Sequence, residues 1–206
     1  MLREGQEVLP WLKVAPDVRI MKRLCSICCA TVPIPAVSGL AVDECIKLNV
    51  DGSVIQPAGS GTCDGLLHNG DGNLVAGFMM KIGRITITFV EIWAIYTGMK
   101  LAVELRINRL QIETDSSCAL KLIDGSSSSH HHTLSLIRAI EDLRSKMTYV
   151  SFKHVFREAN FCADALAKQA RSISTGLLCF ATPPPFLMPL LTDDKGRRKS
   201  VRVVPT

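Results

Sequence analysis

The stretch Ile46-Lys-Leu-Asn-Val-Asp-Gly-Ser53 contains the clearest strand pattern of this 206-residue chain. Apolar residues at positions 46, 48 and 50 alternate with polar residues at 47, 49 and 51. A period of two predicts a strand with one buried face. Gly52 ends or bulges the strand. We therefore expect a strand from about residue 44 that delivers one carboxylate, Asp51, close to its end.

Two further strands follow this first strand, at residues 59–69 and 73–81. Between them lies Asn69-Gly-Asp-Gly72, a strong signal for a tight hairpin. The three strands are therefore predicted to form an antiparallel meander.

Helices and strands alternate beyond the meander. Between residues 89 and 105 the apolar positions recur every three or four residues, which predicts a helix with Glu91 in its first turn. The remaining elements are a strand at 109–114, a short helix to 123, a helix at 133–146, a strand at 149–155 and a helix at 160–171. This order predicts an α/β fold, in which helices pack on a mixed sheet.

Length and composition indicate one folded domain with two flanking segments. Hydrophobic residues make up 47% and charged residues 21% of the chain, which is ordinary globular usage. We expect the domain at residues 44–171, after a leader of uncertain order at 1–43. Residues 172–206 contain three successive prolines and a basic cluster, and we expect a flexible tail there.

The same totals limit the classes of function. The longest apolar stretches are broken by prolines, so we expect no membrane span. Without a secretory signal, the eight cysteines are expected to be free thiols in a reducing compartment, the nucleus or cytoplasm. Cys25-Ser-Ile-Cys28 has no second ligand pair nearby, so zinc is not predicted. The net charge of +5 is too modest to indicate nucleic-acid binding by itself.

Four acidic residues are candidates for a metal site: Asp51, Glu91, Asp115 and Asp164. Each has a structural alternative, respectively a turn, a helix start, a helix cap and a solvated helix position. If they converge, carboxylates about 4 Å apart repel by about 4 kcal/mol at an effective dielectric near 20. Such a cluster favours cations, and its hard oxygen ligands suit Mg²⁺ or Mn²⁺.

Five short strings together suggest a family. They are Lys47-Leu-Asn-Val-Asp-Gly-Ser53, Glu91-Ile-Trp-Ala94, Glu113-Thr-Asp-Ser116, Lys153-His-Val-Phe-Arg-Glu-Ala-Asn160 and Ala163-Asp-Ala-Leu-Ala167. In this order they resemble the reverse-transcriptase-like branch of type 1 ribonuclease H domains, which is common in plants. The resemblance covers about 125 residues. It implies a five-stranded mixed sheet in the order 3-2-1-4-5, flanked by helices, and endonucleolytic hydrolysis of the RNA strand of RNA–DNA hybrids.

The resemblance also implies roles for individual residues. Asp51, Glu91, Asp115 and Asp164 match the carboxylates that hold two Mg²⁺ or Mn²⁺ ions, which can activate water and stabilise the leaving oxygen. His154 matches a mobile histidine that helps proton movement or product release. The alternative for His154 is a surface histidine at a strand end.

Four more residues are candidates for substrate contacts. Gly52 and Ser53 are expected beside the scissile phosphate, and Ser116 beside the Asp115 carboxylate, where hydroxyls can bond phosphate or 2′-oxygen. Asn160 matches a position that contacts the substrate backbone or metal. A serine that follows an aspartate, such as Ser116, is more often a helix cap than a ligand contact. Asn160 could equally cap the last helix.

One departure from the family pattern leaves a second hypothesis open. Some members carry a basic helix and loop that bind the hybrid, whereas residues 124–132 here are mainly serine and histidine. Few phosphate contacts predict weak, salt-sensitive affinity. The first hypothesis is a monomeric metal-dependent nuclease. The alternative is a non-catalytic, retroelement-derived domain that binds nucleic acid, and a third option makes the carboxylates purely structural.

Overall fold

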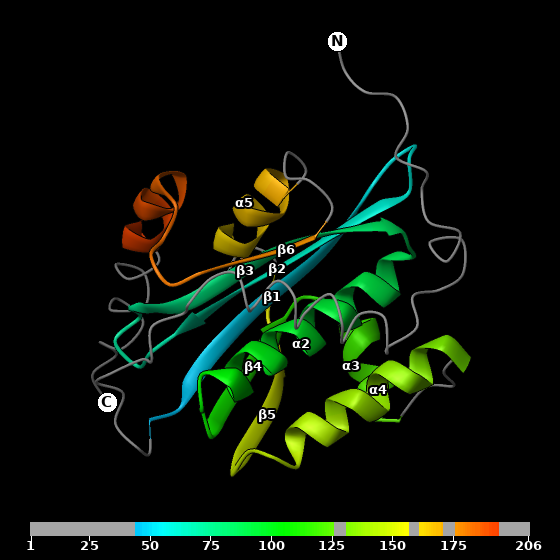
Figure 1. The fold of residues 1–206 in the computed structure, drawn as a ribbon, viewed down its shortest axis with the longest axis horizontal. Coiled ribbons are helices and arrows are strands. Elements are labelled where there is room, and N and C mark those ends of the chain that lie inside the picture. Colours follow the sequence, from blue (N-terminus) through cyan, green and yellow to red (C-terminus); the bar gives the residue numbers. More distant parts are fainter. Residues whose placement is uncertain (1–43, 126–130, 157–160, 171–175, 194–206) are drawn as a thin grey trace.

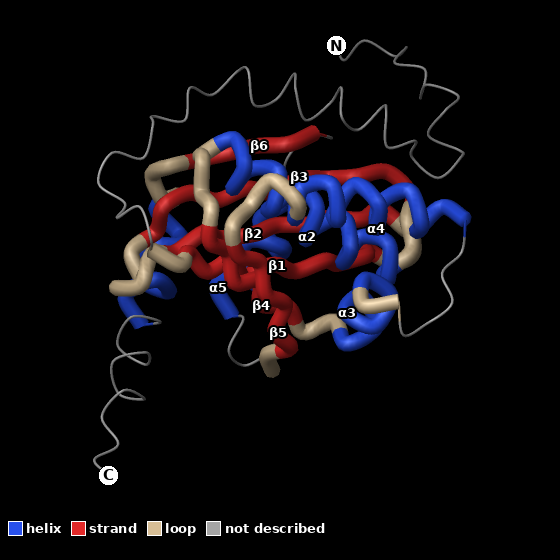
Figure 2. Tube along the Cα trace, turned by 90° about the horizontal axis from the view of Figure 1, so that it is seen from below, coloured by secondary structure: helices blue, strands red, loops and turns tan. Residues whose placement is uncertain are grey.

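The computed structural model describes residues 44–125, 131–156, 161–170 and 176–193. Within them a six-stranded mixed sheet forms the centre of the molecule (Figure 1). Its strands are β1 (Ile46–Ile55), β2 (Ser60–His68), β3 (Leu74–Arg84), β4 (Arg109–Thr114), β5 (Tyr149–His154) and β6 (Gly176–Phe180). The spatial order is β5-β4-β1-β2-β3-β6, and Figure 2 shows it as a succession from β6 at the top to β5 at the bottom.

Helices cover both faces of this sheet (Figure 1). On one face lie α2 (Ile87–Glu104), α3 (Ser117–Ile123) and α4 (His131–Arg144), with α2 packed directly on β1 and β2. On the other face α5 (Phe161–Ala170) packs on β1, β2 and β3. The short helix η3 (Pro185–Leu187) continues into helical residues 188–193 beside α5. No helix among the described residues is both long and apolar enough to cross a membrane.

The main hydrophobic core lies between the sheet and α2, α3 and α4. Alternate β1 residues such as Leu48 and Val50 are fully buried in it, together with most of α2. Gly98 brings α2 close to the sheet, because a Cβ atom there would lie 2.5 Å from the side chain of Leu48. The helix that positions Glu91 is thus held by packing from Phe89 to Ala102.

The predicted meander and strand order are confirmed. β1, β2 and β3 pair antiparallel, whereas β1–β4 and β4–β5 pair parallel, so the order 3-2-1-4-5 is present within the sheet. The predicted hairpin is stabilised by Asn69, whose side-chain oxygen accepts hydrogen bonds from the backbone nitrogens of Asp71 and Asn73. The leader at 1–43 and the tract at 126–130 lie outside the described residues.

Residues 176–193 belong to the segment where we expected a flexible tail, and they contain a strand and helical residues. β6 adds a sixth strand by pairing antiparallel with β3, so the five-strand expectation was one strand short. The Phe180 ring lies over Gly77, where a Cβ atom would be 2.4 Å from its Cζ atom. Leu187 and Leu191 are buried in a second hydrophobic cluster with Leu166 of α5. Tertiary packing therefore orders a segment whose prolines suggested mobility.

Candidate metal centre

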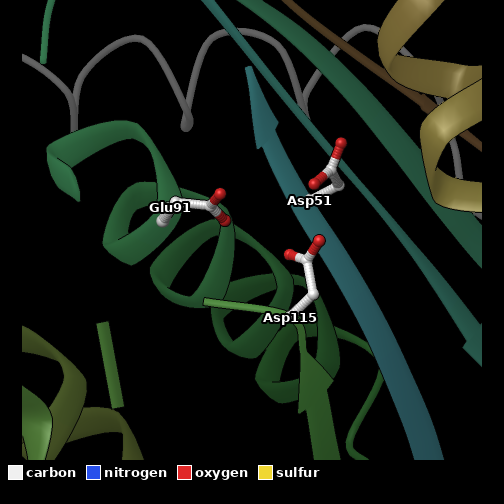
Figure 3. A group of neighbouring side chains, drawn as sticks. All are labelled: Asp51, Glu91 and Asp115. Carbon is white, nitrogen blue, oxygen red and sulfur yellow. The ribbon is translucent and has the colours of Figure 1, made fainter. Parts of the chain in front are cut away.

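Three of the four candidate carboxylates meet at one place. Asp51, Glu91 and Asp115 each offer a carboxylate oxygen, and these oxygens all lie within 4.8 Å of one another. Figure 3 shows the side chains pointing toward a common space from β1, α2 and the residue after β4. Asp51 and Glu91 are buried, at 4% and 7% exposure, whereas Asp115 is partly exposed. The cluster is therefore most accessible to solvent at Asp115.

The fold explains why these three residues converge. β1 and β4 run parallel and pair as far as Asn49 and Glu113. Asp51 and Asp115 each follow two residues later, so both reach the same end of the sheet. α2 lies against β1 at Gly52, where an added Cβ atom would be 2.8 Å from the backbone nitrogen of Glu91. This close contact brings the Glu91 carboxylate beside Asp51. Glu91 was expected in the first turn of the helix, but α2 begins earlier, at Ile87, so Glu91 lies just beyond that turn.

A further buried carboxylate, Asp64 on β2, was missed in the sequence. Asp64 is fully buried and lies directly opposite Asp51 in the β1–β2 ladder. Residues directly opposite in an antiparallel pair share one face, with Cβ atoms about 4.5–5.5 Å apart. Nothing in the sequence singles Asp64 out, because the strand also contains Ser60, Thr62 and His68. Asp64 increases the concentration of acidic side chains around Asp51.

The donor set fits a hard divalent cation. Adjacent or opposite oxygen ligands of one octahedral Mg²⁺ lie about 3–4 Å apart, because each Mg–O bond is about 2.1 Å long. Three carboxylate oxygens within 4.8 Å can reach this arrangement by small side-chain rotations. Carboxylates gathered at this spacing repel one another unless a cation or protons offset their charge. Metal binding therefore explains the convergence of the three carboxylates better than separate roles in a turn or a helix cap.

His154 lies at the rim of the cluster. Its Nε2 atom is 3.1 Å from the backbone carbonyl oxygen of Asp115, and its side chain is exposed. Its ring contacts the ring of Phe156 edge-on at a centroid distance of 6.1 Å. Phe156 is 77% exposed. The structure thus places an imidazole against the backbone of Asp115, the most exposed of the three acidic residues, and an exposed aromatic ring against that imidazole.

Two of the predicted serines have different surroundings. Ser116 caps α3, because its Oγ atom accepts a hydrogen bond from the backbone nitrogen of Ala119. This confirms the capping alternative for Ser116, although the hydroxyl hydrogen can still donate to a ligand. Ser53 is half-buried on β1 beside Gly52. Both serines lie within two residues of a cluster carboxylate in the chain, Ser53 after Asp51 and Ser116 after Asp115.

The other two candidates are less fully placed. Asp164 belongs to α5, which packs on β1 and β2, but its side chain lies outside the described part of the structure. Asn160 precedes α5 and also lies outside the described residues. The structure therefore brings together three of the four predicted carboxylates.

A mixed sheet of this order, with carboxylates on its central strand, on the first helix after the meander and after the neighbouring parallel strand, defines a ribonuclease H-like domain. A family model described as reverse transcriptase-like matches residues 49–170, more than half of the chain. The chain belongs to this reverse transcriptase-like family. The matched residues fall inside the predicted domain at 44–171.

Individual relatives agree with this classification. One is a protein of Arabidopsis thaliana named "Putative ribonuclease H protein", 32% identical over 149 residues, covering 72% of this chain. The chain spans only 24% of that relative's length. Ribonuclease H1 of Halobacterium salinarum superposes with a TM-score of 0.58 at 25% identity, covering 61% of this chain and 96% of that one.

A third relative shows the fold alone. The N-terminal ribonuclease H domain of a Mycobacterium tuberculosis protein superposes with a TM-score of 0.59 at 23% identity. The superposition covers 62% of this chain and 94% of that chain, a fusion with maltose-binding protein.

Proposed function

We propose that this chain is a metal-dependent endonuclease that hydrolyses the RNA strand of RNA–DNA hybrids. The observation that carries the proposal is the convergence of Asp51, Glu91 and Asp115, with carboxylate oxygens within 4.8 Å of one another. Membership of the reverse transcriptase-like family and similarity to proteins named ribonuclease H support it.

In this proposal Asp51, Glu91 and Asp115, joined by Asp164, hold two Mg²⁺ or Mn²⁺ ions. The ions supply an activated water and stabilise the leaving oxygen of the phosphodiester. Burial of Asp51 between neighbouring strands and of Glu91 on a packed helix keeps these two side chains in place. Ligands held in place by their surroundings lose little freedom when they bind an ion.

His154 is proposed to move a proton at the edge of this site. When its Nε2 atom carries the hydrogen and donates to the carbonyl oxygen of Asp115, Nδ1 is the ring nitrogen that accepts a proton. An exposed imidazole also exchanges protons readily with solvent. We assign His154 to proton movement or product release on this geometry.

Contacts to the nucleic acid complete the proposal. Ser116 accepts one hydrogen bond as a helix cap, so its hydroxyl hydrogen remains to donate to a phosphate or 2′-oxygen. Ser53 and the backbone at Gly52 lie beside Asp51, and Asn160 is proposed to contact the substrate backbone. Recognition of the 2′-hydroxyl is the feature that separates an RNA strand from DNA.

We further propose an intracellular location, in line with the free thiols of the described cysteines.

The test is cleavage of a labelled RNA–DNA hybrid by the purified chain with Mg²⁺ or Mn²⁺, beside an Asp115→Asn variant. Metal-dependent cutting of the RNA strand that is lost in the variant supports the proposal. DNA duplex and RNA duplex of the same sequence are the matched substrates and should remain intact. An Asp115→Asn variant that cuts as well as the wild type overturns the site assignment.

A second candidate function is binding without cleavage. It is favoured by the modest net charge of +5 and by the absence of lysine and arginine from residues 124–132. Such a protein would retain the hybrid in EDTA, and its affinity would fall with salt. Retention in EDTA together with no cutting in either metal would favour this candidate over the nuclease.

A further inference from the structure

The last paired residues of the parallel strands β1 and β4 are joined through their side chains. Asn49 and Glu113 face each other at the end of the ladder, and Asn49 Nδ2 donates a 3.0 Å hydrogen bond to Glu113 Oε2. Both residues are buried, at 4% and 7% exposure. The bond connects positions that are 64 residues apart in the chain.

The second oxygen of Glu113 has donors as well. Gln111 Nε2 donates to Oε1 at 2.6 Å, and Lys47 Nζ lies 3.5 Å from the same atom. Side chains from both strands thus converge on one carboxylate. Hydrogen bonds to an ionised acceptor are roughly twice as strong as those between neutral groups. Glu113 is therefore held firmly between β1 and β4.

This cluster lies immediately before the metal ligands. Side chains two residues apart on a strand share a face and lie about 6.5–7 Å apart. Asn49 precedes Asp51 by two residues, and Glu113 precedes Asp115 by two. Because both oxygens of Glu113 already accept bonds, Glu113 is placed behind the proposed ions instead of among their ligands.

We propose that Glu113 and Asn49 are positioning residues for the candidate metal centre. Backbone pairing between β1 and β4 ends at these two residues. Their side-chain bond holds the strand ends together at the point of separation, which sets the spacing between Asp51 and Asp115. The inference rests on the proposed function, because it concerns the geometry of the same metal site.

The chemistry of the pair makes the inference testable with a conservative change. A Glu113→Gln side chain has one acceptor oxygen for the two amide donors of Asn49 and Gln111. Its own amide group would then face a donor, so one buried bond is lost with little change in shape. Asn49→Leu removes the donor from the β1 side. Lys47→Met is the matched control, because the Lys47 side chain is 37% exposed and such pairs contribute little.

The first measurement uses the metal-free full chain. Amide hydrogen exchange should speed up at residues 50–53 and 114–116 in Glu113→Gln and Asn49→Leu, and should stay unchanged in the β2–β3 hairpin and in Lys47→Met. Exchange that is faster throughout the sheet, or that is not faster at residues 50–53 and 114–116, would mean that the bond merely stabilises the sheet. Because no metal is present, this result does not depend on whether the wild type binds metal or cuts. A wild type that neither binds metal nor cuts would count against the proposed function instead.

The second measurement is Mn²⁺ affinity by isothermal titration calorimetry. We expect the two variants to lose about tenfold or more, the usual effect of removing residues that orient metal ligands. The double variant Asn49→Leu/Glu113→Leu separates positioning from stability, since replacing both partners by apolar groups can leave stability nearly unchanged. If the double variant regains the melting temperature of the wild type but not its Mn²⁺ affinity, the two residues act by positioning the ligands. Affinity restored together with melting temperature would overturn this inference.

Discussion

A Cβ atom on Gly52 would lie 2.8 Å from the backbone nitrogen of Glu91 and 3.0 Å from its Cα atom. Real Cβ atoms do not approach backbone this closely, so only glycine lets α2 begin directly against β1. The sequence interpretation placed Gly52 beside the substrate phosphate. The structure adds a packing reason for glycine at this position.

Gly52→Ala should therefore move the start of α2 and carry Glu91 away from Asp51. We expect a loss of about 1–3 kcal/mol in the free energy of unfolding, the usual cost of overpacking, together with weaker Mn²⁺ binding. Denaturant titration and calorimetry measure the two effects. Gly70→Ala is the matched control, since its nearest contact is the flexible Glu44 side chain at 3.4 Å. Unchanged Mn²⁺ affinity in Gly52→Ala would show that this contact does not position Glu91.

Replacing Asp115 with Asn should change stability in opposite directions with and without metal. In EDTA the three carboxylates, whose oxygens lie within 4.8 Å of one another, would repel when ionised by about 3 kcal/mol or more per pair at an effective dielectric near 20. Removing one charge should therefore leave the metal-free variant at least as stable as the wild type. Mg²⁺ at about 100 times its dissociation constant should stabilise the wild type by about 2.7 kcal/mol. Thermal unfolding of both proteins with Mg²⁺ and with EDTA would be compared, and an equal Mg²⁺ shift in the variant would contradict the site.

His154→Ala should lower the turnover number without weakening metal binding. Nε2 contacts the backbone oxygen of Asp115, so removing the ring leaves the carboxylate in place. Loss of a group that moves protons typically costs about 10²-fold or more in rate. Single-turnover cleavage and Mn²⁺ titration provide the two readouts, with the exposed neighbour Lys153→Ala as control. Wild-type turnover would favour the alternative, a surface histidine at a strand end.

Phe156→Ala should weaken binding of the hybrid while leaving turnover at saturation unchanged. A nucleic acid lying across the carboxylates would pass the exposed Phe156 ring beside His154. Stacking on an aromatic ring contributes about 1–3 kcal/mol per base, so KM should rise by about tenfold. Phe186→Ala is the control, because Phe186 lies on η3, which packs against α5. Equal KM values for Phe156→Ala and the wild type would place the substrate elsewhere.

Local patterns in the sequence predicted most of the fold. The alternation in β1, the Asn-Gly-Asp-Gly hairpin and the period of α2 are decided by neighbouring residues, so they can be recognised without tertiary information. β6 could not be found in this way. It has five residues, and its position depends on Phe180 lying over Gly77 in a strand about a hundred residues earlier.

The residues of the candidate site likewise fall into those that local sequence indicates and those that depend on tertiary structure. Asp51, Glu91 and Asp115 could be named from their order and their neighbouring residues, but Asp64 becomes visible only through the register of β1 with β2. The alternation in β1 assigned Asn49 only to the polar face of the strand. Asn49 is buried and donates a hydrogen bond to Glu113. The alternation of polar and apolar residues in one strand does not indicate which side chain of a distant strand will be its partner.

β6 also decides where this domain can be cut. It covers the outer hydrogen-bonding edge of β3, a strand of eleven residues, seven of which are buried. A chain shortened to end at Arg171 would leave that edge without its partner, and bare apolar strand edges recruit other chains. Light scattering should reveal aggregates of residues 44–171 that are absent from residues 44–193. A shortened chain that keeps this partner strand therefore has to extend at least to Phe180, ten residues beyond the last residue of the family match.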